Sequence, residues 1–322
     1  MAEDFYRIDD LPTGFGPCAL TIGNFDGVHR GHQAILKRVV ERAKRLQIES
    51  VALTFEPHPL AIVAPGRAPQ ILTTVAERTK WITEIGIDRV VVLPFTVELS
   101  RLTPEQFVRD ILVERLAPRH ITVGDNFRFG HRHLGDVLKL QQLGAEFGFE
   151  TEAFRAIERC GGVVSSSRVR DVTKRGAMRV ARRLLGRPFS LTGEIVRGEG
   201  IGAKQTVPTI NLAPRSQVLP ADGVYISVTK ELSTDRIWES ITNVGKRPTF
   251  EGKQRTVETF LLGDSVGIFP EEIELYFLRR IRAERRFESA EQLKAQILTD
   301  VRHAERYFTR LRAIRTQSVV VP

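Results

Sequence analysis

The first half of the chain alternates short apolar runs with longer segments whose apolar residues recur at helical spacing. The apolar runs predict strands, and the segments between them predict helices. The predicted strands span residues 18–23, 50–55, 89–95, 120–124 and 151–157. The predicted helices span residues 31–47, 74–86, 104–116 and 135–147. This alternation favours an α/β fold with a parallel sheet covered on both faces, in which ligands bind at the carboxyl ends of the strands.

From Ser190 onward the pattern changes to short apolar runs separated by glycine and proline. Just before this change, residues 165–186 predict one or two short helices, after which the helical pattern breaks. We therefore predict a domain boundary near residue 186. It divides the chain into domains 1–186 and 187–322.

The short apolar runs of the second domain predict strands joined by turns. They span residues 191–196, 223–229, 238–244, 256–262 and 272–279. Strands at this spacing favour an antiparallel β-barrel. After them, residues 289–312 place Leu293, Ile297 and Val301 on one face of a predicted C-terminal helix.

The composition is that of an ordinary globular protein, and 322 residues are enough for two hydrophobic cores. Neither of the two cysteines, Cys18 and Cys160, lies in a cluster typical of a zinc site, and this usage fits a reducing compartment. Residues 1–10 are acidic and lack the apolar core of a signal peptide. No apolar run approaches the ~18 residues that a membrane span needs. We therefore expect a cytoplasmic protein without a membrane partner.

The formal net charge of +9 is compatible with nucleic-acid binding and equally with attraction of anionic small molecules such as ATP. The densest basic runs are Arg279–Arg286 and Arg182–Arg183. Neither run is interleaved with the aromatic residues on which single-strand binders stack bases. We therefore interpret both as solvated basic faces and expect no nucleic-acid partner.

The segment TIGNFDGVHRGHQ, residues 21–33, joins the first predicted strand to the first predicted helix. His29 and His32 lie on either side of Gly31, where the helix begins. Unpaired N–H groups at a helix start bind phosphate, and histidine can donate to phosphate oxygens and to the charge on a leaving pyrophosphate. Alternatively, one histidine caps the helix and the other packs. The arrangement differs from the P-loop and from GxGxxG, and it predicts a nucleoside triphosphate site.

Further polar motifs follow the second and fourth predicted strands. FEPHP holds His58 in a loop stiffened by two prolines, either at the ligand edge of the sheet or simply exposed. GDNFRFG supplies Asn126, whose amide is both donor and acceptor. Phe127 and Phe129 of the same motif are suited to wall a flat ring or to fill the core.

The motif SSSRVR follows the fifth predicted strand and begins a helix. Hydroxyls such as those of Ser166 and Ser167 cap a helix start and also bind phosphate there, so the two roles are compatible. Either Arg168 or Arg170 would neutralise the β- and γ-phosphates of a nucleotide.

These four motifs, in this order, resemble the adenylyltransferase module of bacterial bifunctional FAD synthetases, one of the His-x-Gly-His nucleotidyltransferases. The resemblance implies a Rossmann-like domain in which FMN attacks the α-phosphate of ATP and pyrophosphate leaves. Ser167 stands where the family usually has threonine. By resemblance the residues that bind ATP are Gly23, Asn24, Phe25, His29, Gly31, His32, Ser166, Ser167 and Arg170. His58 and Asn126 would lie on the flavin side.

In the second domain, the glycine-rich segment 193–202 lets backbone amides face a ligand or forms a mobile lid. Thr209 and Asn211 alternate, so on an extended strand both point to one face. Their oxygens suit a phosphate-bound Mg²⁺, although a solvated strand face would look the same. Glu258 lies among apolar residues, as a paired structural charge or a general base.

GEIVRGEGIGAKQTVPTINL, ADGVYIS, NVGKRPTF and ETFLL together resemble the riboflavin kinase module of the same family. The resemblance implies that Thr209 and Asn211 hold Mg²⁺·ATP, while Glu258 takes the proton from the ribityl 5′-hydroxyl, which attacks the γ-phosphate. It also implies ATP contacts from the preceding loop, at Gly198, Gly202 and Lys204. Lys204 replaces the usual arginine charge, shifted by one position.

The whole sequence is therefore interpreted as a bifunctional enzyme that makes FMN from riboflavin and FAD from FMN, with ATP as co-substrate and Mg²⁺ as cofactor. Two alternatives stay open. One is a related nucleotidyltransferase whose barrel only binds, and the other is a basic nucleic-acid-binding protein without catalysis. Thr209, Asn211 and Glu258 favour the enzyme, because a barrel that only binds does not need them.

Overall fold

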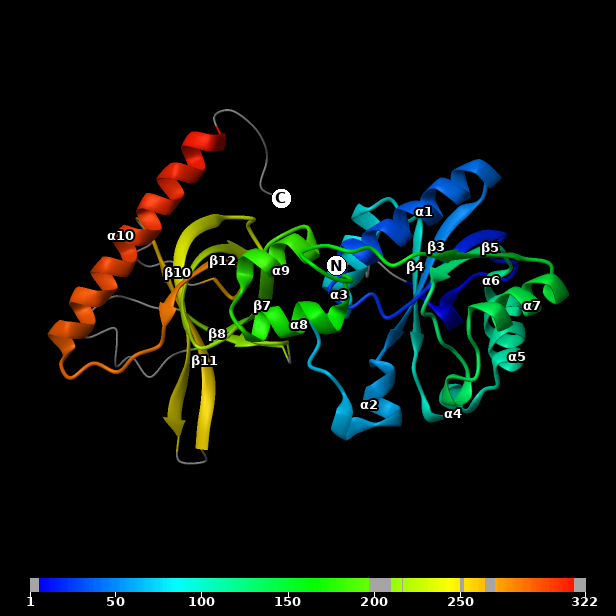
Figure 1. Ribbon diagram of the computed structural model, residues 1–322, viewed down its shortest axis with the longest axis horizontal. Coiled ribbons are helices and arrows are strands. Elements are labelled where there is room, and N and C mark those ends of the chain that lie inside the picture. The colour runs from blue at the N-terminus through cyan, green and yellow to red at the C-terminus, as the bar shows by residue number, and fades with distance from the viewer. Residues whose placement is uncertain (1–5, 197–209, 216, 250–251, 264–269, 316–322) are drawn as a thin grey trace. The chain divides into compact units, whose positions relative to one another are not determined.

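The computed structural model describes residues 6–196, 210–215, 217–249, 252–263 and 270–315 (Figure 1). Within this range the chain divides into two compact units, Met1–Val169 and Arg170–Pro322. The predicted ATP- and Mg²⁺-binding residues Gly198, Gly202, Lys204 and Thr209 lie outside the described residues.

The first unit is built on a sheet of six parallel strands in the order β1-β4-β3-β2-β5-β6. The strands are β1 (Tyr6–Arg7), β2 (Cys18–Ile22), β3 (Glu49–Glu56), β4 (Arg89–Pro94), β5 (Pro118–Gly124) and β6 (Glu150–Phe154). The parallel sheet is confirmed. Strand β1 at its edge was not predicted, because a run of two residues carries no periodicity.

Helices lie between these strands and after the last of them. They are α1 (Arg30–Leu46), α2 (Pro59–Val63), α3 (Val75–Glu84), α4 (Val97–Arg101), α5 (Pro104–Gln106), α6 (Glu114–Leu116), α7 (Val137–Phe147) and α8 (Ser166–Lys174). The helix predicted over 104–116 is continuous in direction but π-helical at Phe107–Val113. Thr103 and Thr74 begin their helices with reciprocal capping boxes, which satisfy otherwise unpaired N–H groups.

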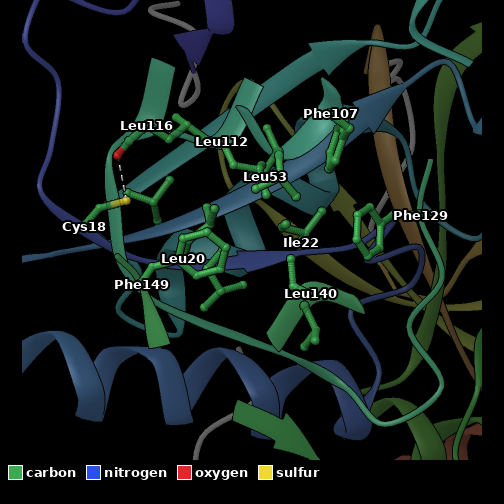
Figure 2. Packing of buried hydrophobic residues seen from close by; sticks show 14 of the residues in the cluster. Cys18, Leu20, Ile22, Leu53, Phe107, Leu112, Leu116, Phe129, Leu140 and Phe149 are labelled. Atoms are coloured by element: carbon green, nitrogen blue, oxygen red, sulfur yellow. Dashed lines mark hydrogen bonds between the residues drawn. The ribbon is translucent and has the colours of Figure 1, made fainter. Parts of the chain in front are cut away.

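Both faces of the parallel sheet are buried, as the apolar strands predict. Cys18, Leu20 and Ile22 of β2 pack on one face against Leu112 and Leu140 (Figure 2). The intervening Ala19 packs on the other face, with residues of α1 and α3. The thiol of Cys18 donates to the Leu116 carbonyl at 3.2 Å, and burial raises its pKa to about 12. Cys18 is therefore a core residue and not a nucleophile.

The predicted antiparallel barrel of the second unit is confirmed. It is closed, and its six strands, one more than the five predicted, follow the order β10-β11-β8-β7-β12-β9. The strands are β7 (Phe189–Val196), β8 (Ile210–Pro214), β9 (Gly223–Glu231), β10 (Ile237–Thr249), β11 (Gly252–Leu261) and β12 (Glu272–Ala283). Helix α9 (Met178–Leu185) lies against β7 and β12, and the predicted C-terminal helix is α10 (Ala290–Arg315).

Alternate residues of the barrel strands point inward and outward. Buried hydroxyls of Ser227, Thr242 and Thr259 are hydrogen-bonded to one another across neighbouring strands inside the barrel, at 2.7 and 3.0 Å. On the outside, Phe308 of α10 packs against Ile226, so α10 lies along one side of the barrel (Figure 1). None of the helices that the structure describes combines the length and the apolar character needed to traverse a bilayer.

Candidate active sites

One buried carboxylate holds the loop between β2 and α1 in place. Asp26 accepts hydrogen bonds from the backbone N–H groups of Leu72 and Thr73, at 2.9 and 3.0 Å, and from the Thr73 hydroxyl at 3.2 Å. Phe25 and Val28 hold positive φ values of 47° and 36°, which non-glycine residues rarely adopt. The loop thus has one rigid, sharply turned course into α1.

His29 is the N-cap of α1. Its Nδ1 accepts from the backbone N–H of His32 at 3.2 Å, and the two imidazole rings stack with centroids 3.6 Å apart. Because Nδ1 is an acceptor, neutral His29 carries its proton on Nε2, where it acts as a donor. Gly31 makes room for this stack, since a Cβ there would lie 3.1 Å from the His29 ring.

His32 contacts the His29 ring on one side and the Phe25 ring, edge to face at 5.3 Å, on the other. Its Nδ1 is shielded from solvent and has no hydrogen-bond partner among the described residues. Burial, helped by the nearby charges of His29 and Arg78, lowers the pKa of His32 well below 6.5. His32 is therefore neutral at physiological pH. One histidine does cap and the other does pack, and both roles leave polar ring atoms at the helix start.

Sequence reasoning missed Arg78, which is only 3% exposed on α3. Its guanidinium donates to the carbonyls of Asn24 and Phe55 at 2.9 and 3.0 Å, and so joins the ends of β2 and β3. Burial lowers its pKa, while Asp26 and Glu56 partly offset the effect. Nothing in the amphipathic pattern of α3 distinguishes this arginine from a solvated one.

His58 comes from the next loop along the sheet edge and is the N-cap of α2. Its Nδ1 accepts from the Leu60 N–H at 3.2 Å, and its Nε2 lies 3.4 Å from the side-chain amide of Asn24. The structure thus brings His58 to the loop that carries Asn24. Asn126 is exposed at the end of β5, and Phe129 of the same motif belongs to the hydrophobic core.

The serine motif also reaches the same loop. Ser166 donates through its hydroxyl to the Asp26 carbonyl at 2.9 Å, so the start of α8 lies beside the start of α1. Arg168 instead donates to the carbonyls of Arg159 and Gly162 at 2.7 and 2.6 Å. Those bonds fold the loop before α8 and give Arg168 a structural role. The second candidate arginine, Arg170, is buried, and Ser167 of the same motif is exposed.

In the barrel, strand register places three polar residues in one row. Glu258 of β11 lies directly opposite Asn211 of β8 and, on its other side, opposite Asn243 of β10. Directly opposed residues share a face. The neighbours of Glu258 in β11, Val257 and Thr259, are buried inside the barrel. The row therefore lies on the outer face, where all three side chains are half-buried.

Two further features of this outer face were missed from the sequence. Asn243 begins the NVGKRPTF motif and was not among the predicted site residues, because its register opposite Glu258 needs the folded sheet. Glu284, just after β12, lays its carboxylate over Gly245, where a side chain would collide with it. Among the described residues Glu258 itself forms no ion pair.

A parallel sheet with two histidines at a helix start, followed by a barrel with a carboxylate between two amides, defines a two-module transferase that uses nucleotides. Family models agree with this class: the FAD synthetase model matches residues 13–168, and the riboflavin kinase model matches residues 185–308.

Whole-chain relatives identify the family. The bifunctional riboflavin kinase/FMN adenylyltransferase of Escherichia coli K12 is 36% identical over 291 residues, which cover 90% of this chain and 93% of the relative. The protein of the same name from Pseudomonas fluorescens is 38% identical over 285 residues, covering 88% and 91%. This chain belongs to the bifunctional riboflavin kinase/FMN adenylyltransferase family, which confirms the function expected from its motifs.

A solved structure also resembles the whole chain. The crystal structure of a protein from Streptococcus pneumoniae, titled a macrolide-efflux protein, superposes with a TM-score of 0.83 at 26% identity. The match covers 92% of this chain and 96% of that one.

Proposed function

We propose that the parallel-sheet unit adenylylates FMN and that the barrel phosphorylates riboflavin, with the functional boundary near residue 186. The two family models support this division, because one match ends at residue 168 and the other begins at residue 185. The observation that carries the proposal is the pair of polar constellations: stacked imidazoles at the start of α1, and Glu258 between two amides on the barrel.

In the adenylylation step, an oxygen of the FMN phosphate attacks the α-phosphorus of ATP. A new P–O bond forms while the bond to the β-phosphate breaks, and its electron pair leaves with pyrophosphate. We assign the Nε2–H of His29 and the positive dipole end at the start of α1 to the developing charge. Ser166, Ser167 and Arg170 bind the triphosphate from α8. Catalysis then consists of positioning and charge stabilisation, without a protein nucleophile.

The remaining residues of the sheet edge position the substrates. Gly23 lets a substrate approach the backbone closely. It also leaves room for the Phe25 ring, since a Cβ at this position would lie 3.2 Å from that ring. Asn24 and Phe25 belong to the rigid loop beneath the ATP, and Gly31 keeps the start of α1 open to phosphate. On the flavin side we assign His58 and Asn126.

In the kinase step, Glu258 accepts the proton of the ribityl 5′-hydroxyl as that oxygen attacks the γ-phosphorus of ATP, and ADP leaves with the electron pair of the broken P–O bond. Asn243 and Asn211 flank the carboxylate and orient it. Other ATP contacts are assigned to the loop before β8, at Gly198, Gly202 and Lys204.

The donor set on this face fits Mg²⁺, because the Asn211 amide oxygen is a hard ligand beside a carboxylate. We assign the metal to Asn211 and Thr209. Bound there, Mg²⁺ would neutralise charge on the ATP phosphates. Removing divalent cations with EDTA is expected to stop FMN formation, and restoring Mg²⁺ is expected to recover it. FMN formation that continues in EDTA would contradict the assignment.

We further propose that the enzyme works in the cytoplasm on small molecules alone, without nucleic-acid or membrane partners. The decisive experiment incubates the full chain with riboflavin and Mg²⁺·ATP and separates the flavins by chromatography. We expect FMN to appear first and FAD to follow. Recovery of unchanged riboflavin, from protein shown to be folded by circular dichroism, would refute the proposed function.

A further inference from the structure

We propose that the cavity between α10 and strands β9 and β12 binds a phosphorylated aromatic ligand of about mononucleotide size. Its volume is about 580 Å³, within the range of roughly 300–1,000 Å³ that is typical of small-molecule sites. None of the residues assigned to either reaction lines it. The kinase row lies on β8, β10 and β11, whereas this cavity is formed by Ile226 of β9, by residues 279–281 of β12 and by α10.

The cavity takes one continuous face of α10. The lining residues of this helix recur at helical spacing and are His303, Arg306, Tyr307, Arg310, Leu311 and Ile314. The neighbouring face of the same helix, with Ala304 and Phe308, packs on the barrel, and Tyr307 and Leu311 of the cavity face also contact that cluster. A helix that only packed would continue apolar residues around this edge. Here cationic and apolar side chains are mixed instead.

A bulge in β12 turns a further cation into the same cavity. Phe277 lies opposite Ser227, which points into the barrel. The register then shifts by one residue, so that Arg279 lies opposite Ile226, which is on the outer face beneath α10. Bulges re-aim side chains in this way, often beside functional sites. Without the extra residue, the alternation would place a different side chain here.

The lining is strongly cationic. It includes Arg279, Arg306 and Arg310, and no acidic side chain is among its described residues. Within the described part of the chain, neither Arg279 nor Arg310 forms an ion pair. Arg306 and Arg310 are four residues apart on one helix, where like charges repel. A bound phosphate would relieve this repulsion and accept the planar hydrogen bonds that arginine donates.

The apolar part of the cavity lining favours a ligand that carries an aromatic ring. Tyr307 is half-buried beside Ile281 and Leu311, and Ile314 at the rim is 68% exposed. Large exposed apolar residues beside cations are typical of surfaces that bind amphipathic ligands. An aromatic ring on Tyr307 with a phosphate on the arginines satisfies both halves of the cavity. Adenine nucleotides and phosphorylated flavins share this chemistry, and both occur in the proposed reactions.

The test measures hydrogen exchange of the full chain with four separate probes: FMN, ADP, riboflavin and pyrophosphate. We expect FMN or ADP to protect peptides that cover residues 279–281 and 303–314, and whichever protects more identifies the source. Riboflavin lacks the phosphate and pyrophosphate lacks the ring, so each should protect these peptides much less. No protection there by any of the four probes would overturn the proposal.

Two exposed arginines provide a matched pair of charge reversals. Arg310→Glu should weaken binding at the cavity by about tenfold or more, because it replaces a cationic hydrogen-bond donor with a carboxylate that repels the ligand's phosphate. Arg236→Glu lies in the turn between β9 and β10, outside the cavity, and should leave the protection intact. Both variants should form FMN and FAD at the rates of the parent protein, so failure of this site is distinguishable from failure of the proposed function.

Persistence of the α10 protection in Arg310→Glu would mean that it arises from the substrate sites, and this would refute the cavity as a ligand site. Should that variant fail to fold, Arg310→Gln removes the charge more gently and decides the question by the same measurement.

Discussion

His29 combines a structural and a chemical role, and two substitutions separate them. Its Nδ1 accepts the His32 N–H at 3.2 Å as the cap of α1. His29→Ala removes both the cap and the imidazole, whereas His29→Ser restores only a cap acceptor. Both variants lose the buried ring, so that loss cancels between them. The serine variant should therefore be more stable than the alanine variant by about 1 kcal/mol, within the ~0.5–2 kcal/mol typical of a lost cap.

In contrast to stability, activity should be lost equally in the two variants. Neither alanine nor serine can place a donor where Nε2 of His29 lies. Loss of one donor aimed at developing charge slows a reaction by ~10²–10³, which corresponds to ~2.7–4 kcal/mol. We expect both variants to slow FAD formation from supplied FMN and ATP by this factor, while riboflavin phosphorylation on the barrel stays unchanged.

The assay separates flavins by chromatography, with riboflavin or FMN supplied in parallel reactions. Urea unfolding of the sheet unit is followed by the fluorescence of Trp81, in a background where Trp238 is replaced by phenylalanine. A serine variant that forms FAD at the parent rate would refute the chemical role and leave His29 as a cap alone. Equal stability of the two variants would refute the cap contribution.

Three further perturbations follow from the same structure. Glu258→Gln should lower FMN formation by ~10²–10⁴, the usual contribution of a general base, and spare FAD formation from FMN; equal loss of both reactions would argue against two separate sites. Arg78→Lys should destabilise the sheet unit by ~1–3 kcal/mol, because one ammonium cannot reach both carbonyls, and an unchanged urea midpoint would contradict this. Burial lowers the pKa of His32 and of His120 below the ordinary 6.5. Below pH 6.5 the unfolded chain therefore binds protons that the folded unit does not, and stability should fall as the pH is lowered from 7 to 5.5; a flat urea midpoint across this range would rule the coupling out.

Much of the fold was readable from local pattern. Strand–helix alternation in the first half predicts a parallel sheet covered on both faces. In the structure Cys18 and Leu20 are buried on one face and Ala19 on the other. Topology then brings the loops after β2 and β3 to one edge, because parallel strands end on the same side. That is why His29 and His58, which are 29 positions apart, meet the same loop.

The barrel site was readable only in part. The sequence singled out Glu258 and Asn211 by residue type and by resemblance. Their pairing depends on strand register, which local sequence does not reveal. The same register brings in Asn243, which the local sequence does not distinguish from any other polar residue of a predicted strand.

The sequence by itself determined the class of each unit and the chemistry of its motifs, because periodicity, glycine placement and side-chain type are local properties. Tertiary structure alone decided that Arg78 is buried between two strand ends, that Arg168 folds a loop, and that a bulge turns Arg279 toward α10. The partners of Arg78 and Arg279 are carbonyls or strands far away in the chain, whereas those of Arg168 are carbonyls six and nine residues before it. The contribution of each arginine to stability or binding therefore depends on partners that only the folded chain brings within reach.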